Sequence, residues 1–202
     1  MRALILLLLL GGAARAEDLK PELRIQRRYV EKKHRFALYG GFAYHGRSDY
    51  YYSPGIELAV SFYALESLAV DLRGDCFFSV PTNELKEVAA NTGYIPDTRP
   101  SRAAVQAGVR WSIGYAKLRL SATRALHFEP QLFAYIGIHI TQGDFAQLRV
   151  APLGDVGIGF LVYATRKLQA RLDAGLTIMG EERSQYVAVV GGLPSLSLGV
   201  MF

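Results

Sequence analysis

The feature that most constrains this chain is an alternation of apolar and polar residues that recurs in eight separate segments. Between residues 168 and 179, for example, Leu172 and Leu176 fall on one face, and Arg171 and Asp173 fall on the other. A period of two is typical of a β-strand with a single apolar face. The alternating segments are 34–45, 55–62, 67–78, 102–111, 129–140, 154–163, 168–179 and 194–202.

The first sixteen residues predict export from the cytoplasm. MRALILLLLLGGAARA combines a basic Arg2, a short apolar stretch and a small-residue cleavage pattern that ends at Ala16. This is the three-part pattern of a secretory signal peptide, and its apolar part is too short to span a membrane as a helix. The single cysteine, Cys76, excludes an internal disulfide.

Two architectures could use eight such strands, a membrane barrel or a secreted soluble β-protein. Tilted strands of about 9–11 residues cross a bilayer, which matches most of the segments. Their apolar faces are uninterrupted, whereas a soluble sheet breaks its edge strands with charge or proline. We therefore predict an all-β fold, an eight-stranded antiparallel transmembrane β-barrel of the outer-membrane type. Its expected divisions are a signal peptide (1–16), a basic periplasmic segment (17–33) and the barrel (34–202), in the bacterial outer membrane.

The predicted connections follow the rule of short periplasmic turns and longer outer loops. Inner turns are expected at 64–67 and 165–167, and outer loops at 46–53, 79–101, 143–151 and 181–193. Segment 112–127 also alternates and could be a ninth strand. Because bacterial single-chain barrels have even strand numbers, it is interpreted as a periplasmic excursion, with a short helix as one possible form.

The polar face of the strands predicts the contents of the lumen. Acidic and basic side chains share this face, and opposite charges in a narrow interior should pair, since an unpaired buried charge is costly. A lumen filled in this way is a plug rather than a channel. The predicted lumen network comprises Glu57, Asp71, Arg73, Asp75, Arg102, Arg110, Glu129, Asp155, Arg171 and Asp173.

The strand ends carry two further predictions. Tyr44, Phe62 and Trp111 are expected at the membrane interfaces, where aromatic girdles lie. Leu198, Val200 and the terminal Phe202 are expected to form the signal that the barrel insertion machinery recognises.

The basic segment before the first strand is interpreted as a solvated leader, with contact to anionic headgroups or a periplasmic protein as the alternative.

Several stretches of the chain resemble a known family. IQRRYVEKKHRFAL (25–38), SFYALESLAVDLR (61–73), YAKLRL with HFEPQLFAYIGIHI (115–140) and GDVGIGFLVYATRKLQARLDAGL (154–176) are similar to the small outer-membrane β-barrel proteins typical of myxobacteria and related deltaproteobacteria. A Gly-Lys-Phe type turn of those proteins is replaced here by Ala116-Lys117-Leu118. The resemblance implies an outer-membrane barrel without catalytic residues, in some relatives part of envelope-spanning assemblies such as gliding machinery.

Little in the sequence indicates chemistry. A lipid-modifying enzyme needs a serine beside a histidine base, and strand parity places no serine beside His139, while His34, His45 and His127 fall at turns or the outer rim. The histidines lack metal-ligand spacing, so no catalytic residue, metal or cofactor is predicted. The net charge of +5 is too small and scattered to indicate nucleic acid.

The expected partners are outer-membrane lipid, the barrel insertion machinery and an envelope protein. The function expected is structural or interactive, with a small porin-like channel or a lipid A-modifying enzyme as alternatives.

Overall fold

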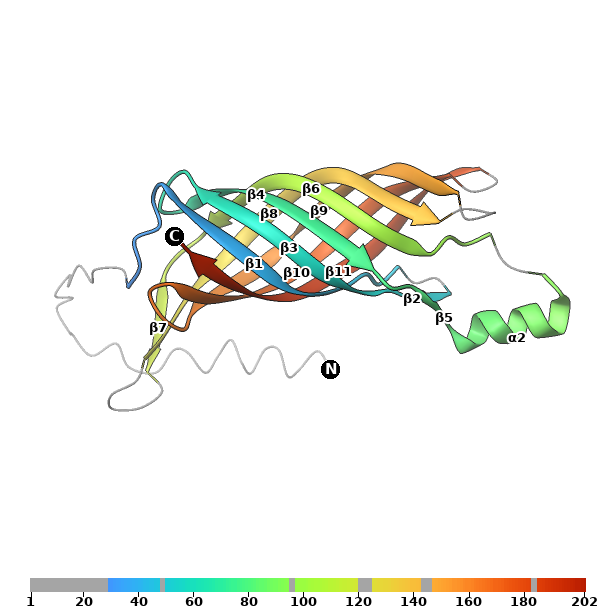
Figure 1. Ribbon diagram of the computed structural model, residues 1–202, viewed down its shortest axis with the longest axis horizontal. Helices are drawn as coiled ribbons and strands as arrows, with labels where there is room; N and C mark the ends of the chain where they lie inside the picture. The colour runs from blue at the N-terminus through green and yellow to red at the C-terminus, as the bar shows by residue number, and fades with distance from the viewer. Residues whose placement is uncertain (1–28, 48–49, 95–96, 120–124, 143–146, 183–184) are drawn as a thin grey trace, which may run out of the picture.

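The computed structural model describes residues 29–47, 50–94, 97–119, 125–142, 147–182 and 185–202. The predicted signal peptide and most of the basic segment lie outside these ranges. Eight antiparallel strands form a closed ring in the order β6-β4-β3-β1-β11-β10-β9-β8, and β6 pairs again with β8 (Figure 1). The predicted fold is confirmed.

The strands of the barrel are β1 (Arg35–Tyr44), β3 (Pro54–Tyr63), β4 (Leu68–Phe77), β6 (Ser101–Ser112), β8 (Ala125–Gln142), β9 (Leu148–Tyr163), β10 (Leu168–Glu182) and β11 (Tyr186–Met201). Outside the ring lie β2 (Tyr51–Tyr52), β5 (Val80–Pro81), α2 (Asn83–Thr92) and β7 (Ala116–Arg119). Along most of each barrel strand, exposed and buried residues alternate, as in β3. The alternation read from the sequence therefore separates a wall that faces outwards from a wall that faces the lumen.

The first and last strands close the ring. β1 pairs with β11 over seven residues, from Ala37 opposite Met201 to Ala43 opposite Ser195. The last residue is held as well, because the backbone N–H of Phe202 donates to the carbonyl of Phe36 at 2.9 Å. From Ala37 to Ala43, closure pairs both edges of β1, which is the condition for a β-structure that is surrounded by lipid.

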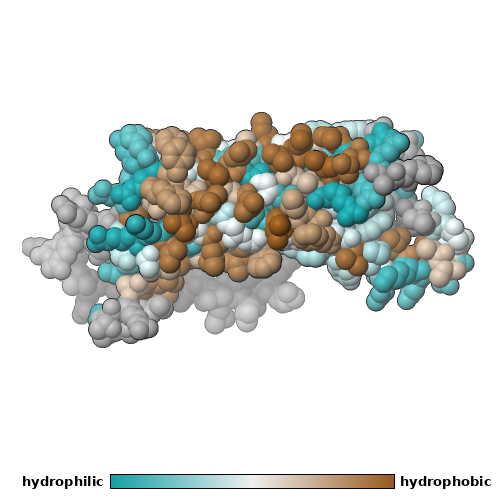
Figure 2. All heavy atoms as spheres, in the orientation of Figure 1, coloured by the Kyte–Doolittle hydropathy of each residue, from teal (hydrophilic) through white to brown (hydrophobic). Residues whose placement is uncertain are grey.

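The outside of the barrel is apolar over its middle. Figure 2 shows hydrophobic residues across the centre of the visible face and hydrophilic residues towards both ends. A closed barrel with this exterior is suited to lipid and not to water, and the protein is an integral barrel of the bacterial outer membrane. No helix of the described chain is long and apolar enough to cross a membrane. Outward-facing apolar side chains include Leu38, Phe42, Leu58, Leu72, Val105, Ile136, Val156, Leu172 and Leu198.

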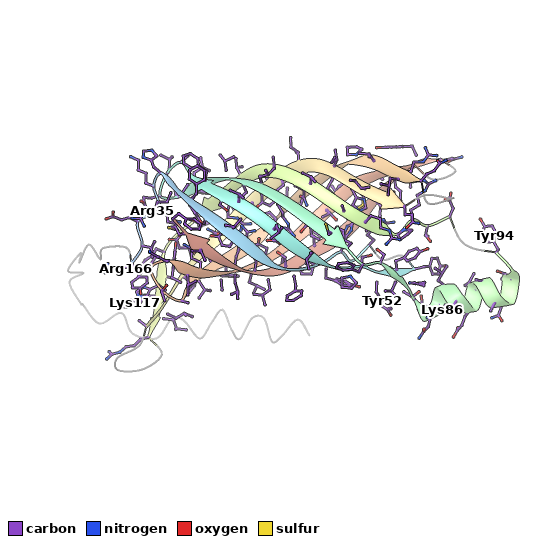
Figure 3. The ribbon with its side chains drawn as sticks, in the orientation of Figure 1. Arg35, Tyr52, Lys86, Tyr94, Lys117 and Arg166 are labelled. Atoms are coloured by element: carbon purple, nitrogen blue, oxygen red, sulfur yellow. The ribbon has the colours of Figure 1, made fainter. Side chains whose placement is uncertain are left out.

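The two ends of the barrel differ. One end has tight connections at 64–67 and 164–167, together with the start of β1 and the end of β11. Arg35, Lys117 and Arg166 lie at this end in Figure 3, whereas Tyr52, Lys86 and Tyr94 lie at the other. By the rule of short inner turns, the first end is periplasmic.

Two of the outer connections are shorter than predicted. β8 continues to Gln142 and β9 begins at Leu148, while β10 and β11 are separated by residues 183–185 alone. Residues 148–151 of the predicted loop 143–151 belong to β9, and most of the predicted loop 181–193 belongs to β10 and β11. The predicted loop 79–101 contains β5 and α2, whose first turn is capped by the Thr82 hydroxyl accepting from the N–H of Leu85.

The interpretation of segment 112–127 is corrected in part. β7 is neither a helix nor a ninth barrel strand, because it pairs with the first residues of β8 alone, from Ala116 opposite Phe128 to Arg119 opposite Ala125. In Figure 1 this hairpin extends from the periplasmic end, away from the barrel wall. The part of the segment between residues 120 and 124 lies outside the described chain.

Candidate functional site

The lumen is lined by buried side chains, which form three layers along the barrel axis. The periplasmic layer is aromatic and aliphatic, with Tyr39, Tyr63, Leu161 and Met201 among its buried members. A second apolar cluster, which includes Phe77 and Met179, lies towards the outer end. The charged side chains are concentrated between them, where they are almost completely shielded from solvent.

Arg110 is the centre of the charged layer. Its guanidinium makes a two-point contact with Asp173, with Nη1–Oδ1 at 2.9 Å and Nη2–Oδ2 at 2.7 Å. Its Nε also donates to Asp71 at 3.0 Å, and its Nη2 to the Tyr135 hydroxyl at 2.6 Å. A planar guanidinium matched to a carboxylate in this way is one of the strongest polar contacts in proteins.

Two more arginines extend the charged layer. Arg171 contacts Glu57 at 2.7 Å and reaches Asp71 at 3.4 Å. Asp71 belongs to β4 and Arg171 to β10, and these strands are diametrically opposite in the ring. Arg73 binds Glu57 at 3.0 Å and Asp75 at 3.1 Å. Arg171 thus bridges opposite walls, whereas Arg73 joins the neighbouring strands β3 and β4.

The charged layer is connected to the periplasmic mouth through neutral side chains. Arg110 donates to Gln131 at 3.2 Å, and Gln131 donates to the Ser112 hydroxyl at 3.1 Å. Ser112 then accepts from Nζ of Lys32, also at 3.1 Å. One continuous network therefore runs from Asp75 near the outer end to Lys32 at the inner end.

Lys32 closes the periplasmic mouth of the lumen. Its side chain is fully buried and forms an ion pair with Glu129, whose other oxygen accepts from Tyr163 at 2.9 Å. The ammonium also lies 5.0 Å from the centre of the Tyr63 ring, a cation–π geometry. Sequence reasoning assigned this lysine to the solvated leader, and the alternation pattern contains no signal for it because it precedes the first strand.

The chain around Lys32 is held by the first inner turn. The carboxylate of Glu66 accepts from the backbone N–H groups of Lys32 at 3.1 Å and Lys33 at 2.9 Å. Val30 is buried against the lumen layer below, and the ring of Tyr29 stacks on His127 with centroids 4.3 Å apart. Residues 29–33 therefore form a short plug across the mouth, fixed at several points.

The outer end of the lumen is closed by a second polar group. Arg47 pairs with Glu181 at 3.0 Å, and both side chains are buried. Beneath them, Nδ1 of His45 lies 3.1 Å from the Ser101 hydroxyl, and the rings of His45 and His139 meet edge to face with centroids 5.1 Å apart. His45 was predicted at the outer rim, but it is inside the lumen.

The contact between Ser101 and His45 has the residue types of a nucleophile and its base. Its surroundings do not match a lipid-modifying site, since both side chains are almost fully buried in the lumen instead of facing lipid. No described side chain accepts from or donates to His45 Nε2, so an acid that would orient the base is missing among these residues. Within the described chain, no three histidine, cysteine or acidic side chains are arranged to hold a metal.

Asp155 differs from the other lumen acids. It is almost fully buried, yet neither carboxylate oxygen has a hydrogen-bond donor within the described residues. Thr177 lies directly opposite on β10, and its hydroxyl is also without a described partner. Buried polar groups of this kind commonly bind ordered water.

Nine of the ten predicted lumen residues are buried inside the barrel. Arg102 is the exception: it is exposed on the outside and its Nε donates to Gln142 at 2.7 Å. The prediction for Arg102 is wrong because the register shifts between Ser101 and Ala103, so that Ser101 and Ala104 both face inwards. A bulge of this kind reverses the parity of every residue beyond it.

The predicted interface aromatics all point outwards. Trp111 and Phe62 are at the periplasmic ends of β6 and β3, and Tyr44 is at the outer end of β1. Phe62 packs on Phe36 with ring centroids 4.7 Å apart. Leu198, Val200 and Phe202, predicted as the assembly signal, form an exposed stripe on β11 and the residue after it.

Solved structures with this fold are known. The chain is similar to the N-terminal β-barrel domain of Pseudomonas aeruginosa OprF, with a TM-score of 0.52, 10% identity, and coverage of 84% of this chain and 98% of that one. It is also similar to Neisserial surface protein A, NspA, with a TM-score of 0.55, 9% identity, and coverage of 83% and 97%. No protein-family model and no curated protein sequence matches the chain. At these identities the likeness shows the fold alone, and the chain spans nearly the whole length of both barrels.

Proposed function

We propose that this protein is a non-enzymatic outer-membrane barrel with a structural or interaction role, and that its lumen does not conduct. The observation that carries the proposal is the packing of Arg110 and Arg171 across the lumen between acidic partners, with Arg73 and its two acidic partners beside them. Eight strands enclose a space just wide enough for side chains, and here these side chains fill it with ion pairs. The plug at Lys32 adds a second closure.

A role in contacts with other envelope components fits this architecture. Without a channel or a lipid-facing catalytic pair, the surfaces that remain are the two ends of the barrel and its lipid-facing wall. The finer role that the sequence resemblance implies is that of a subunit of an envelope-spanning assembly such as gliding machinery. It is tested by crosslinking intact cells and isolating the barrel with its bound proteins.

Conductance in planar bilayers tests the closed lumen. The wild type should give no steady current, because the charged layer leaves no continuous water path. A variant with Arg110→Ser and Arg171→Ser should stay closed, because the Lys32 plug and the Arg47–Glu181 pair still cover the two mouths. Addition of Lys32→Ser and Arg47→Ser should open a path, and this variant, refolded and checked for heat-dependent gel mobility, serves as the positive control. Stable ohmic currents from the wild type would instead support the porin-like alternative.

A further inference from the structure

The periplasmic end of the barrel carries a group of exposed basic side chains from three separate segments. They come from the start of β1, from β7 and from the turn between β9 and β10. In Figure 3, Arg35, Lys117 and Arg166 all lie at this end, opposite the end that carries Lys86. We call this set the basic collar: Lys33, Arg35, Lys117, Arg119, Arg166 and Lys167.

Few acids balance the basic collar. Within the described chain, Glu31 is the one fully exposed acidic residue at this end. Glu66 is half-buried, and its carboxylate is engaged by the backbone N–H groups of Lys32 and Lys33. The lumen acid at this end, Glu129, is neutralised by Lys32. Among the described residues of this end, the six basic side chains of the collar therefore outnumber the exposed acids.

The collar lies at the boundary of the lipid-facing wall. Arg35 directly precedes Phe36, and Lys167 directly precedes Leu168; both apolar side chains are at least half exposed on the outer wall. Lys117 adjoins the exposed Leu118 in β7, and the hairpin of β7 extends sideways from the barrel in Figure 1. In a bilayer, side chains at this depth lie among the headgroups, not deep in the periplasm.

We propose that the basic collar binds anionic phospholipid headgroups in the inner leaflet of the outer membrane. The proposal rests on the proposed function as an outer-membrane barrel. Lysine and arginine next to an anionic surface are attracted to it roughly in proportion to their number. A lipid is favoured over an acidic periplasmic protein because two of the basic segments directly adjoin apolar residues of the outer wall, Phe36 and Leu168, and the third adjoins the exposed Leu118.

The single tryptophan reports on this boundary. Trp111 is half exposed on the outer wall at the periplasmic end of β6, five residues before Ala116 starts β7. Brominated lipid chains quench tryptophan when they are in contact with it. Refolded protein would be placed in phosphatidylcholine vesicles that contain increasing amounts of brominated phosphatidylglycerol or, separately, brominated phosphatidylcholine.

For the wild type, the mole fraction that gives half-maximal quenching should be on the order of fivefold lower for brominated phosphatidylglycerol than for brominated phosphatidylcholine. This is the ratio expected from about one basic contact per lipid. The variant Lys117→Glu with Arg166→Glu should lose this difference. Lys86→Glu, at the outer end, should keep it and is the matched control. High salt should also reduce the difference, because the attraction is electrostatic.

The possible results distinguish a failure of the headgroup proposal from a failure of the membrane-barrel assignment. If both brominated lipids quench Trp111 equally in the wild type, the protein is in the bilayer and the headgroup proposal is overturned. If neither lipid quenches, the membrane barrel itself is wrong. Absence of headgroup preference, together with binding of an acidic periplasmic protein that is lost in the Lys117→Glu, Arg166→Glu variant, would overturn the proposal in favour of a protein contact.

Discussion

Arg110 on β6 and Asp173 on β10 form a two-point ion pair across the lumen, with N–O distances of 2.7 and 2.9 Å. Asp71 on β4 and Arg171 on β10 complete the group. Asp71 contacts Arg110 and Arg171, and Arg171 also contacts Asp173. Ion pairs that span the lumen hold together strands that are not neighbours in the sheet. They stabilise the closed form of the barrel as well as filling its lumen.

Removal of one central charge should be costly, and removal of an unpaired charge should not. Arg110→Met leaves Asp71 and Asp173 to Arg171 alone, so the free energy of unfolding should fall by about 3–5 kcal/mol. Asp155→Asn should leave it unchanged or raise it, because the carboxylate has no described donor. Urea titration in lipid vesicles measures both. A large loss for Asp155→Asn would mean that this carboxylate binds a partner or ion in the membrane.

The plug predicts different effects for two adjacent lysines. Lys32→Met leaves Glu129 buried without its cation and should destabilise the barrel by about 3–5 kcal/mol. Lys33→Met changes an exposed side chain and should shift the free energy of unfolding by less than about 0.5 kcal/mol. Unfolding of the two variants in urea compares them directly. Equal effects would show that the Lys32 side chain does not seal the mouth.

The outer wall predicts a dependence on depth in one strand. Leu172→Arg places a cation near the middle of the lipid-facing side of β10 and should cost about 2–4 kcal/mol. Leu168→Arg, on the same face at the periplasmic end, should cost about 0–1 kcal/mol, because its charge can reach the headgroups. Leu172 and Leu168 are about equally exposed, at 53% and 50%, so depth is the variable. Similar losses at both positions would contradict the assigned membrane boundary.

Close packing in the lumen predicts that some glycines cannot gain a methyl group. A Cβ on Gly199 would lie 2.3 Å from the ring of Tyr39 and 2.9 Å from the Leu38 carbonyl oxygen. Gly199→Ala should therefore destabilise by about 1–3 kcal/mol. Gly40→Ala, on the lipid side of the adjacent strand, meets nothing nearer than 3.5 Å and should be tolerated. Thermal unfolding of the two variants in detergent would reveal the contrast.

The terminal phenylalanine should act in assembly more than in stability. Phe202→Ser removes a ring that is 72% exposed, and the refolded barrel should be nearly as stable as the wild type. In cells, less of it should reach the outer membrane, because the last strand must be recognised while its edge is unpaired. Phe42→Ser, with a ring 73% exposed, is the control and should assemble normally. Wild-type levels of Phe202→Ser in outer-membrane fractions would show that Phe202 is not a signal.

The alternation of apolar and polar residues predicts the strands less well at the outer end of the barrel. Inside the bilayer one face meets lipid and the other meets charge, so alternation is strict and the strands can be recognised. In 186–193, at the outer end of β11, both faces carry apolar residues and glycine. Pro152 lies within β9 although proline usually disfavours a strand. The pattern therefore predicts loops where the first four residues of β9 and the outer half of β11 lie.

The sequence by itself determined the number of barrel strands and the wall to which Glu57, Asp71 and Arg171 belong, because side chains in a strand alternate with a period of two. It could not determine which charges meet, since Arg171 and Asp71 are a hundred residues apart and come together only when the ring closes. It also could not place Arg102, whose side is set by a bulge in the pairing with β8. Lys32 shows the same limit most clearly. It precedes the first strand, yet it is buried, because closure of the barrel creates a mouth that contains Glu129. Only the tertiary structure brings the Glu129 carboxylate to the Lys32 ammonium.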